Sequence, residues 1–385
     1  MKKVCVVTGT RAEYGLLKPV IKRICESELL DLQLVVTGTH LSPEFGFTYQ
    51  EIEKDGYKIT YKVEMLLSSD TCVGITKSMS LALIGFGEFF EQYKPDIVVI
   101  LGDRYEMLMV ATAALIAKIP IAHIHGGEST EGAIDEAIRH SITKMSYFHF
   151  TATEAYRKRV IQLGENPARV YNTGALGVEN IKTVSLLNKI ELEKVLGFNI
   201  QEKMILVTYH PVTLENLSAR QQFSNILYVL NKYKDYFIVF TKANADPDGR
   251  IINQMIDEYV NENQQNCIAF SSLGQLRYLS ILPFCSFVLG NSSSGIIEVP
   301  SFRIPTVNIG DRQKGRICAD SICSCGNTID EIDDAIKKVI SKEWNEKTKK
   351  SSNLYEGVNT SQKIVSILEE TLVNGIDIKK TFFDL

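Results

Sequence analysis

The 385-residue chain lacks features that would assign it to several common functional classes. It has no excess of positive charge, because 42 lysines and arginines against 46 aspartates and glutamates give a formal net charge of -4, which argues against a nucleic-acid-binding surface. The apolar stretch that begins at Val4 breaks at Thr8-Gly9, so it is too short for a signal peptide or a membrane span. We therefore predict a cytoplasmic protein with neither a membrane nor a nucleic-acid partner.

The chain also lacks paired cysteines. Its eight cysteines are scattered, and Cys5 lies inside an apolar, strand-like run. Structural zinc sites normally carry paired Cys-x-x-Cys elements, and the one cluster, Cys318, Cys323 and Cys325, does not have that spacing. We therefore predict reduced thiols, with the clustered ones in a loop, and no metal site.

The usual nucleotide-binding fingerprints are absent as well. The loop after the first apolar run reads Gly9-Thr10-Arg11-Ala12-Glu13-Tyr14-Gly15. This string matches neither Gly-x-Gly-x-x-Gly nor Gly-x-x-x-x-Gly-Lys-Ser/Thr, which argues against a bound dinucleotide and against a P-loop ATPase. The sequence therefore predicts no cofactor.

Strand-like apolar runs alternate with amphipathic helical stretches, which is typical of a parallel sheet with helices on both faces. Because the length exceeds what one core usually supports, we predict an α/β fold of two Rossmann-like domains, residues 1–178 and 179–385, facing a central cleft. We interpret the stretch from Glu179 to Lys203, which is polar and helical in character, as a linker, and the chain after Ser351 as a helix that packs back on the first domain. The predicted strands are Val4–Val7, Leu32–Val36, Ile97–Leu101, Ile121–Ile124, Phe148–Thr151, Val170–Asn172, Met204–Thr208, Tyr236–Phe240, Asn266–Phe270, Phe287–Leu289 and Thr306–Ile309.

Three acidic side chains lie at or near strand ends in the first half. Asp103 and Glu128 follow two buried strands, and Asp135 lies one short loop later on a predicted helix over residues 133–142, together with Arg139. Because the carboxyl ends of parallel strands meet at one edge of a sheet, we expect these carboxylates to gather there. Carboxylates grouped in this way indicate acid–base chemistry.

The second half carries a pattern suited to a diphosphate. The loop 291–295 reads Asn-Ser-Ser-Ser-Gly between a strand and a helix, so backbone N–H groups at the helix start can meet phosphate oxygens, although N-capping by serine explains the loop equally well. Arg11, Arg104 and Arg312 each follow a strand, and guanidinium groups match phosphate oxygens. Glu298 fits either the two hydroxyls of a ribose or a solvated position on the helix. Together these residues favour a nucleotide diphosphate.

The six histidines divide into three groups, one of which, His125 and His140, flanks the carboxylates and is predicted to orient them. His210 ends an apolar strand, so we expect its ring to face the cleft, and His40 follows the second strand in a similar way. His123 and His149 lie within buried runs and are predicted to be core residues. His210 and His40 are therefore the candidate ligands.

Several strings, in order and in both halves, resemble those of the hydrolysing UDP-N-acetylglucosamine 2-epimerases of sialic-acid biosynthesis. The resemblance extends from the first strand to Arg316 and implies the two-Rossmann arrangement called GT-B. The strings are Val7–Tyr14, Gly102–Arg104, His125–Glu128, Ile134–Ser141, His210–Thr213, Gly290–Gly295 and Gly310–Gln313.

The resemblance implies conversion of UDP-N-acetylglucosamine and water to N-acetylmannosamine and UDP by a homodimer or homotetramer. It assigns catalysis to Asp103, Glu128, Asp135 and His210. Two residues that follow strands, His40 and Asn244, complete the predicted binding set. The nucleotide contacts that the resemblance implies are Arg11, Arg104, Ser292, Ser293, Glu298 and Arg312.

Three departures from the family pattern leave the sugar open. His125 stands where many relatives have glutamate, Gly15 where some have serine, and Lys242-Ala243-Asn244 replaces a Pro-Asn-Asn string. A close subfamily acts on a 2,4-diacetamido-2,4,6-trideoxy sugar nucleotide on the way to legionaminic acid. A UDP- or GDP-linked sugar of that kind is therefore the alternative substrate.

The expected mechanism is elimination followed by addition of water. Departure of UDP from C1 makes the C2 hydrogen acidic, and its removal gives a 2-acetamidoglucal to which water adds with the opposite stereochemistry at C2. Asp103, Glu128 and Asp135 would share proton removal and return, with His210 bonded to the diphosphate or acting as an acid. The competing hypotheses are a GT-B glycosyltransferase, a non-catalytic UDP-sugar-binding regulator and a non-hydrolysing epimerase.

Overall fold

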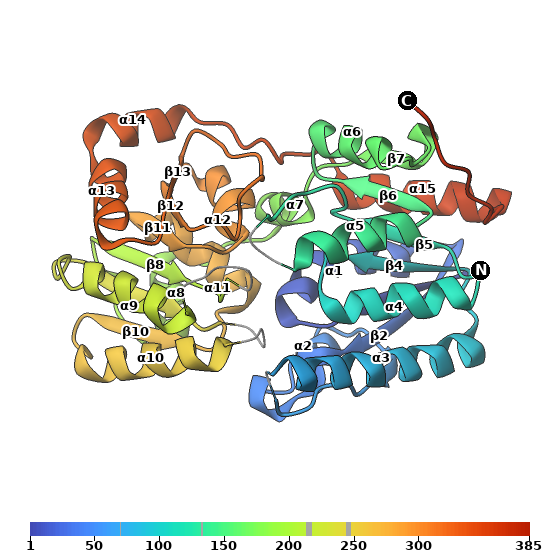
Figure 1. Cartoon of the computed structure of the whole chain (residues 1–385), viewed down its shortest axis with the longest axis horizontal. Coiled ribbons are helices and arrows are strands. Elements are labelled where there is room, and N and C mark those ends of the chain that lie inside the picture. The colour runs from blue at the N-terminus through green and yellow to red at the C-terminus, as the bar shows by residue number, and fades with distance from the viewer. Residues whose placement is uncertain (70, 132–133, 213–217, 244–247) are drawn as a thin grey trace. The chain divides into compact units, whose positions relative to one another are not determined.

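The computed structural model describes residues 1–69, 71–131, 134–212, 218–243 and 248–385 (Figure 1). The chain divides into two compact units. Unit 1 contains Met1–Glu128, Asp135–Asn180 and Tyr355–Leu385, and unit 2 contains Ser129–Ile134 and Ile181–Leu354. Each unit has its own parallel sheet, so the predicted α/β class with two Rossmann-like sheets is confirmed.

Unit 1 is built on a seven-stranded sheet with the order β3-β2-β1-β4-β5-β6-β7, in which every pairing is parallel. The strands predicted for both units are all present, with ends that differ from the prediction by no more than two residues. The sequence missed β3, because its exposed edge position places polar Thr60 and Lys62 among the apolar residues. The strands are β1 (Lys2–Thr8), β2 (Leu30–Thr37), β3 (Ile59–Val63), β4 (Ile97–Leu101), β5 (Ile121–Ile124), β6 (Phe148–Thr151) and β7 (Val170–Asn172).

Helices cover both faces of this sheet. The alternation of side chains along β1 shows the two layers, because Val4 and Val6 pack with one buried cluster while Cys5 and Val7 pack with the other. Helix α7 leads from unit 1 into unit 2. The helical segments are α1 (Arg11–Glu26), η1 (Gly38–Leu41), η2 (Pro43–Phe45), α2 (Tyr49–Lys54), α3 (Cys72–Tyr93), α4 (Tyr105–Ile116), α5 (Asp135–Met145), α6 (Glu154–Gln162), η3 (Pro167–Arg169), α7 (Leu176–Thr183) and α15 (Thr360–Asn374).

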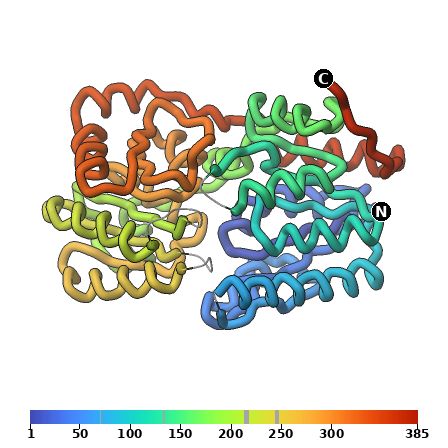
Figure 2. The backbone as a smooth tube through the Cα atoms, viewed as in Figure 1, coloured from blue at the N-terminus to red at the C-terminus, as the bar shows by residue number. Residues whose placement is uncertain are grey.

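The end of the chain belongs to unit 1. Helix α15, in the red part of the tube, lies against α1, and Ile364 and Leu368 join Leu17 and Ile21 in one buried cluster (Figure 2). The segment is also bonded to the unit, because the Tyr355 carbonyl accepts a hydrogen bond from the Ala175 N–H (3.0 Å). Residues remote in sequence therefore complete the first core.

Helix α3 is 22 residues long, and it is the one helix in the described part of the chain that is apolar and long enough to cross a membrane. About 33% of its apolar window is buried, and Phe86 and Phe90 on that side pack under the sheet. Val73, Leu81 and Ile84 on the opposite side are exposed. The apolar character of α3 therefore has two parts, a core face and an uncovered face.

Unit 2 contains a six-stranded parallel sheet with the order β10-β9-β8-β11-β12-β13. The sequence missed β13 and placed Cys323 and Cys325 in a loop, but both belong to this edge strand, where Cys323 pairs with Val307 and Cys325 with Ile309. The strands are β8 (Met204–Thr208), β9 (Phe237–Thr241), β10 (Cys267–Phe270), β11 (Phe287–Gly290), β12 (Thr306–Ile309) and β13 (Ile322–Cys325).

The stretch interpreted as a linker contains a helix of the second core. Leu192 and Leu196, four residues apart on α8, are buried with Ile200 and Met204, so this part of the stretch packs on the sheet rather than spanning a gap. The linker interpretation is wrong here because the leucines, not the surrounding charges, determine its position. The helices of unit 2 are α8 (Lys189–Leu196), α9 (Ala219–Leu230), α10 (Gly249–Glu262), α11 (Gly274–Ile281), η4 (Leu282–Phe284), α12 (Ser294–Ile297), η5 (Val299–Phe302), α13 (Ile329–Ile340) and α14 (Lys342–Lys350).

Candidate active site

The turns after β4 and β5 have tightly constrained backbones. Gly102, His125 and Gly127 all have positive φ, at 78°, 67° and 78°. A Cβ atom on Gly127 would lie 2.5 Å from the Tyr156 carbonyl oxygen, so only glycine fits there. His125 has no such freedom, and its left-handed conformation is held by a hydrogen bond from its N–H to the Phe150 carbonyl (2.8 Å). Such strained positions gather at functional sites.

Arg139 joins these turns to α5. Its side chain is fully buried, and its Nη2 contacts a carboxylate oxygen of Asp103. Its Nη1 donates to Glu136 Oε2 (2.7 Å) and to the backbone carbonyl of Glu128 (3.0 Å). Because a buried guanidinium must be paired, Arg139 holds the end of β4, the end of β5 and the first turn of α5 in one arrangement.

Glu128 and Asp103 have different surroundings. The Glu128 side chain is 2% exposed, and its Oε1 lies 3.3 Å from His125 Nδ1. The Asp103 side chain is 22% exposed and is held by Arg139. Two carboxylates in unlike environments can take different roles in proton transfer.

Asp135 is the first residue of α5 and is partly exposed. The predicted helix began at Ala133, which lies outside the described residues, and α5 continues to Met145. The carboxylate of this first turn that Arg139 bonds at 2.7 Å is that of Glu136. Sequence reasoning did not single out Glu136, although its spacing of three residues from Arg139 is the signal that could have found it.

Two of the predicted binding residues in the first half have partners within unit 1. Arg11 forms an ion pair with Glu51 on α2 (2.7 Å). His40 is buried, with Thr8 Oγ1 3.0 Å and Thr48 Oγ1 2.8 Å from its two ring nitrogens. Burial lowers the pKa of His40 to about 4, so the ring is neutral. Contact between His40 and a nucleotide would require these hydrogen bonds to be replaced.

The predicted core positions of His123 and His149 are confirmed, since both side chains are fully buried. His123 Nε2 lies 2.7 Å from the Gly102 carbonyl oxygen, and burial lowers its pKa to about 3. His123 therefore supports the turn after β4 as a neutral ring.

Arg104 belongs to a second charged group at the same edge of the sheet. Its Nε donates to Glu106 Oε1 (2.7 Å), and Glu106 is almost fully buried. Glu13 is buried nearby and accepts a hydrogen bond from the Gly9 N–H (2.6 Å). Burial, together with the charge of Glu106, raises the pKa of Glu13 to about 8. Sequence reasoning missed both glutamates, because an acid in the first turn of a helix is ordinarily explained by the helix dipole.

In unit 2, Asn291 fixes the loop that carries His210. Asn291 is fully buried, and its Oδ1 accepts from the His210 N–H (2.7 Å) while its Nδ2 donates to the His210 carbonyl (2.8 Å). The two bonds join the loop after β8 to the loop after β11. The His210 side chain itself is mostly buried. Asn291 was part of the predicted loop but was not recognised as its anchor.

Arg312 approaches the same loop from the end of β12. Its Nη1 donates to the Asn291 carbonyl (3.2 Å), and Gln313 Nε2 donates to the same oxygen (2.9 Å). Ser293 is the N-cap of α12 but makes no side-chain capping bond within the described residues, and Ser292 Oγ accepts from the Ser294 N–H (3.4 Å). N-capping therefore explains little of this serine run.

Glu298 is half-buried rather than freely solvated, and burial raises its pKa. Asn244 lies outside the described residues. Among the residues that the structure describes, no group of three His, Cys, Asp or Glu side chains is arranged to hold a metal ion. Unit 1 thus carries Asp103, Glu128, Asp135, Arg11, His40 and Arg104, and unit 2 carries His210, Ser292, Ser293, Glu298 and Arg312.

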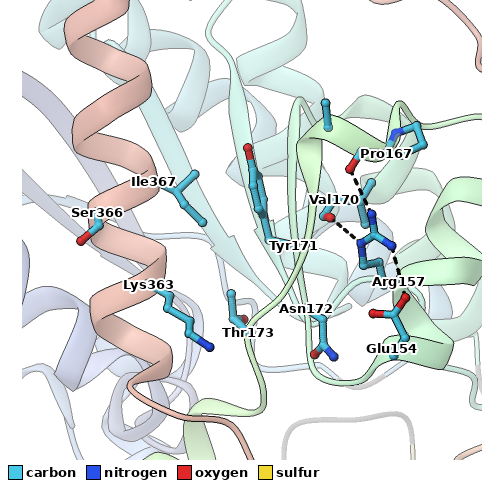
Figure 3. Close-up of a pocket in the computed structure, with 11 residues that line it drawn as sticks. Glu154, Arg157, Pro167, Val170, Tyr171, Asn172, Thr173, Lys363, Ser366 and Ile367 are labelled. Carbon is cyan, nitrogen blue, oxygen red and sulfur yellow. Dashed lines mark hydrogen bonds and ion pairs between the residues drawn. The ribbon is translucent and has the colours of Figure 1, made fainter.

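A cavity of about 570 Å³ lies elsewhere on unit 1, between α6, the edge strand β7 and α15 (Figure 3). Arg157 in its wall donates to the carbonyls of Val170 (2.8 Å) and Pro167 (3.4 Å) and pairs with Glu154 (3.2 Å). No predicted site residue in the described chain lines this cavity. Because the arginine secures the strand edge, we do not place the active site there.

Comparison with known proteins identifies the family. The family model described as UDP-N-acetylglucosamine 2-epimerase matches residues 22–369. The chain belongs to the UDP-N-acetylglucosamine 2-epimerase family. Its resemblance to these enzymes, inferred above from seven strings, is therefore confirmed.

Two curated relatives and one solved structure refine this placement. The epimerase-family chain is 44% identical over 384 residues to the hydrolysing GDP/UDP-N,N′-diacetylbacillosamine 2-epimerase of Campylobacter jejuni, covering 100% of this chain and 99% of that protein. It is 38% identical over 390 residues to the polysialic acid biosynthesis protein P7 of Escherichia coli, with 100% and 98% covered. The crystal structure of the UDP-GlcNAc 2-epimerase of Neisseria meningitidis bound to UDP-GlcNAc superposes with a TM-score of 0.80 at 21% identity, covering 96% of this chain and 100% of that one, which supports the shared fold.

Proposed function

We propose that this member of the epimerase family is a hydrolysing 2-epimerase of a nucleotide-linked 2,4-diacetamido-2,4,6-trideoxy sugar. The observation that carries the proposal is the Arg139-centred group of carboxylates after β4 and β5. The sugar is taken from the relative that is 44% identical over the whole chain, since N,N′-diacetylbacillosamine is a sugar of this kind. The nucleotide is UDP or GDP.

A second candidate substrate is UDP-N-acetylglucosamine, with N-acetylmannosamine and UDP as products. It is the substrate that the sequence strings imply, and the relative named for polysialic acid biosynthesis, 38% identical, favours it. The two sugars share the acetamido group at C2 and the diphosphate at C1, so the same chemistry serves both. They differ at C4 and C6.

The proposed reaction begins with departure of the nucleoside diphosphate from C1. The C1–O bond breaks, positive charge grows at C1 and the ring oxygen, and the C2 hydrogen becomes acidic enough for a carboxylate to remove. The resulting C1–C2 double bond then takes up water, with the hydroxyl at C1 and a proton at C2 on the face opposite to the one that lost it. These steps yield the sugar epimerised at C2 and the free nucleoside diphosphate.

The carboxylates of unit 1 are proposed to move these protons. Arg139 contacts the Asp103 carboxylate and fixes its direction, while His125 lies beside the Glu128 carboxylate. Asp135 completes the predicted acid–base set from the first turn of α5. Each positioned acid or base contributes about 10²- to 10⁴-fold to such a step.

The residues of unit 2 are proposed to hold the leaving group. Arg312 and the serine loop lie around Asn291, which also fixes the backbone of His210. A guanidinium group and N–H donors stabilise the negative charge that grows on a departing diphosphate. Glu298 is proposed to accept hydrogen bonds from the ribose hydroxyls.

We also propose a cytoplasmic homodimer or homotetramer. The uncovered face of α3, with exposed Val73, Leu81 and Ile84, is a surface that a second copy would cover, and exposed Leu115 and Ile116 on the adjoining α4 extend it. Sedimentation of the wild-type protein and of Ile84→Glu tests this. A monomeric wild-type protein would contradict it.

The decisive experiment is a panel of UDP- and GDP-linked amino sugars assayed for nucleotide release with no acceptor present, in deuterated water. We expect release from the 2,4-diacetamido substrate, with one solvent deuteron at C2 of the product. Asp31→Asn, an exposed substitution on β2, serves as the matched control for Asp103→Asn. Product without deuterium would contradict proton removal at C2.

The other outcomes select among the competing functions. Release that needs an acceptor would indicate a glycosyltransferase, and binding without release would indicate a regulator. A product that keeps its nucleotide would indicate a non-hydrolysing epimerase. Chromatography of the products separates these cases.

A further inference from the structure

Two buried glutamates flank the end of β1, apart from the Arg139 group. Glu13 on α1 and Glu106 on α4 are 5% and 1% exposed. Gly9 lies between them, because its N–H donates to Glu13 Oε2 (2.6 Å), while a Cβ atom at Gly9 would lie 2.9 Å from Glu106 Oε1. Glutamate is rarely buried to this extent unless a partner compensates for the loss of water.

Of the four carboxyl oxygens of Glu13 and Glu106, only two accept a hydrogen bond within the described part of the chain. Glu106 Oε1 accepts from Arg104 Nε (2.7 Å) and Glu13 Oε2 accepts from Gly9, whereas Glu106 Oε2 and Glu13 Oε1 are buried without a hydrogen-bond partner among the described residues. Two ionised carboxylates would repel each other here. Burial, together with the charge of Glu106, raises the pKa of Glu13 to about 8, which favours the neutral form of Glu13 at neutral pH.

Of the two glutamates, Glu106 is the one that pairs with Arg104. The Arg104–Glu106 contact is sheltered, with side-chain exposures of 18% and 2%, whereas Arg11 pairs with the more open Glu51, at 25% and 39%. A bond at Nε fixes the plane of a guanidinium group, and a buried acceptor holds that plane more firmly than an exposed one. Of these two predicted nucleotide ligands, Arg104 is the more firmly oriented.

We propose that Glu106, seated against Gly9 beside Glu13, is a positioning residue that orients the Arg104 guanidinium for the diphosphate of the nucleotide. The inference rests on the proposed function, in which Arg104 contacts that diphosphate. Glu106 itself touches no substrate and acts through Arg104. Glu13 lies one step further back, as a neutral group that adds no second negative charge beside Glu106.

The test is a double-mutant cycle on nucleotide affinity, with UDP and GDP as probes in isothermal titration calorimetry. Arg104→Ala and Glu106→Ala should each weaken binding roughly 10- to 100-fold, the range expected for a hydrogen bond between charged groups. The double variant should bind within about 3-fold of Arg104→Ala, because Glu106 has nothing left to orient. If the double variant instead loses affinity by the product of the two single-variant factors, Arg104 and Glu106 act independently and the inference is overturned.

Conservative and matched variants distinguish a positioning role of Glu106 from a general loss of structure. Glu106→Gln retains an oxygen that can accept a hydrogen bond from Arg104 Nε, so it should recover much of the nucleotide affinity that Glu106→Ala loses. If Glu106→Ala does not fold, the double-mutant cycle is measured with Glu106→Gln and Arg104→Ala instead. Glu13→Gln copies a neutral carboxyl group and should change affinity by less than about 3-fold. Glu51→Ala removes the exposed pair and should also have a small effect. A loss with Glu13→Gln as large as that with Glu106→Ala would contradict the neutral role of Glu13.

The same data separate this inference from the proposed function. A wild-type protein that binds neither UDP nor GDP would overturn both. Wild-type binding together with multiplying losses would overturn only the positioning role. Thermal unfolding of each variant, unchanged from wild type, would show that the lost affinity is not lost structure.

Discussion

Two buried ionic groups lie at opposite ends of the parallel strands in unit 1, and the signs of their charges are reversed. At the carboxyl ends of β4 and β5, one buried cation, Arg139, contacts the carboxylates of Asp103 and Glu136. Near the start of β6, one buried anion, Glu165, is surrounded by Lys144, His149 and Lys380. In the Arg139 group, acidic side chains surround one cation, and in the Glu165 group, basic side chains surround one anion.

The Glu165 group is saturated by its own donors. Oε1 accepts from Lys144 (2.6 Å), and Oε2 lies 3.0 Å from His149 Nε2 and 2.7 Å from Lys380 Nζ. Burial alone would raise the pKa of Glu165, but these donors outweigh it and lower the pKa to about 2. The C-terminal segment closes the group, because Lys380 also donates to the Ser146 carbonyl (2.6 Å). Such an arrangement stabilises a fold and leaves neither oxygen of Glu165 without a partner.

The Arg139 group differs in its backbone as well as its charge. It lies beside His125 and Gly127, whose positive φ angles strain or restrict the chain, and it includes Asp103, whose side chain is partly open to solvent. Strain and an excess of acid both cost stability, so their coincidence indicates selection for chemistry. The comparison predicts that one group controls turnover and the other controls stability.

The largest expected effect is on turnover. Asp103→Asn removes the charge but keeps the shape, so kcat should fall about 10²- to 10⁴-fold while UDP affinity and the unfolding midpoint remain near wild type. Steady-state kinetics, calorimetry and thermal unfolding measure the three quantities. Equal losses of turnover and affinity would mean that Asp103 mainly supports the binding site, and the contrast between the two groups would fail.

The next largest effect is on stability. Glu165→Gln leaves Lys144, His149 and Lys380 without their anion, so the free energy of unfolding should fall by about 3 kcal/mol, the lower end for a broken buried pair because Lys144 reaches solvent. Urea unfolding measures the change, and kcat should stay within a factor of two. A matching loss of turnover would show that the Glu165 group and the Arg139 group are coupled.

The same variant tests the pH dependence of the group. Because the pKa of Glu165 is lowered in the folded protein, its contribution is fully present above the unfolded value near 4.5 and is lost as pH falls toward about 2. His149 adds to the loss, since burial lowers its pKa and protonation below its ordinary value disfavours the fold. Wild-type stability should therefore decline more steeply below pH 4.5 than that of Glu165→Gln. Parallel curves would exclude Glu165 as the source.

The sequence located the residues that follow strands but not the ones that bind them. Asp103, Glu128 and His210 were found because an apolar strand and the polar residue after it are neighbours in the chain. Glu13, Glu106 and Asn291 act through contacts with other elements, and Glu165 depends on Lys380, more than two hundred residues away. Local patterns contain no information on such pairs.

Fold prediction failed at two of the four edge strands, β3 and β13, for a related reason, although the edge strands β7 and β10 were predicted. Central strands such as β1 and β4 are buried on both faces and read as continuous apolar runs, whereas β3 and β13 have one neighbour each and keep polar residues. The helical character of the stretch that contains α8 was predicted, but its packing on the core was not, because only Leu192 and Leu196 of this helix are buried. A strand or helix that is buried on one side only has too few apolar residues for the sequence pattern to predict its packing.

The smallest expected effect concerns the closing residue of the Glu165 group. Lys380→Met removes one of three donors but leaves Lys144 and His149, and burial already lowers the pKa of Lys380, so the free energy of unfolding should fall by only about 1 kcal/mol. Lys379→Met, an exposed neighbour in the same segment, is the control and should be silent. If Lys380→Met instead costs as much as Glu165→Gln, the C-terminal segment is the main source of the stability of this group, because the two remaining donors cannot hold Glu165 without it.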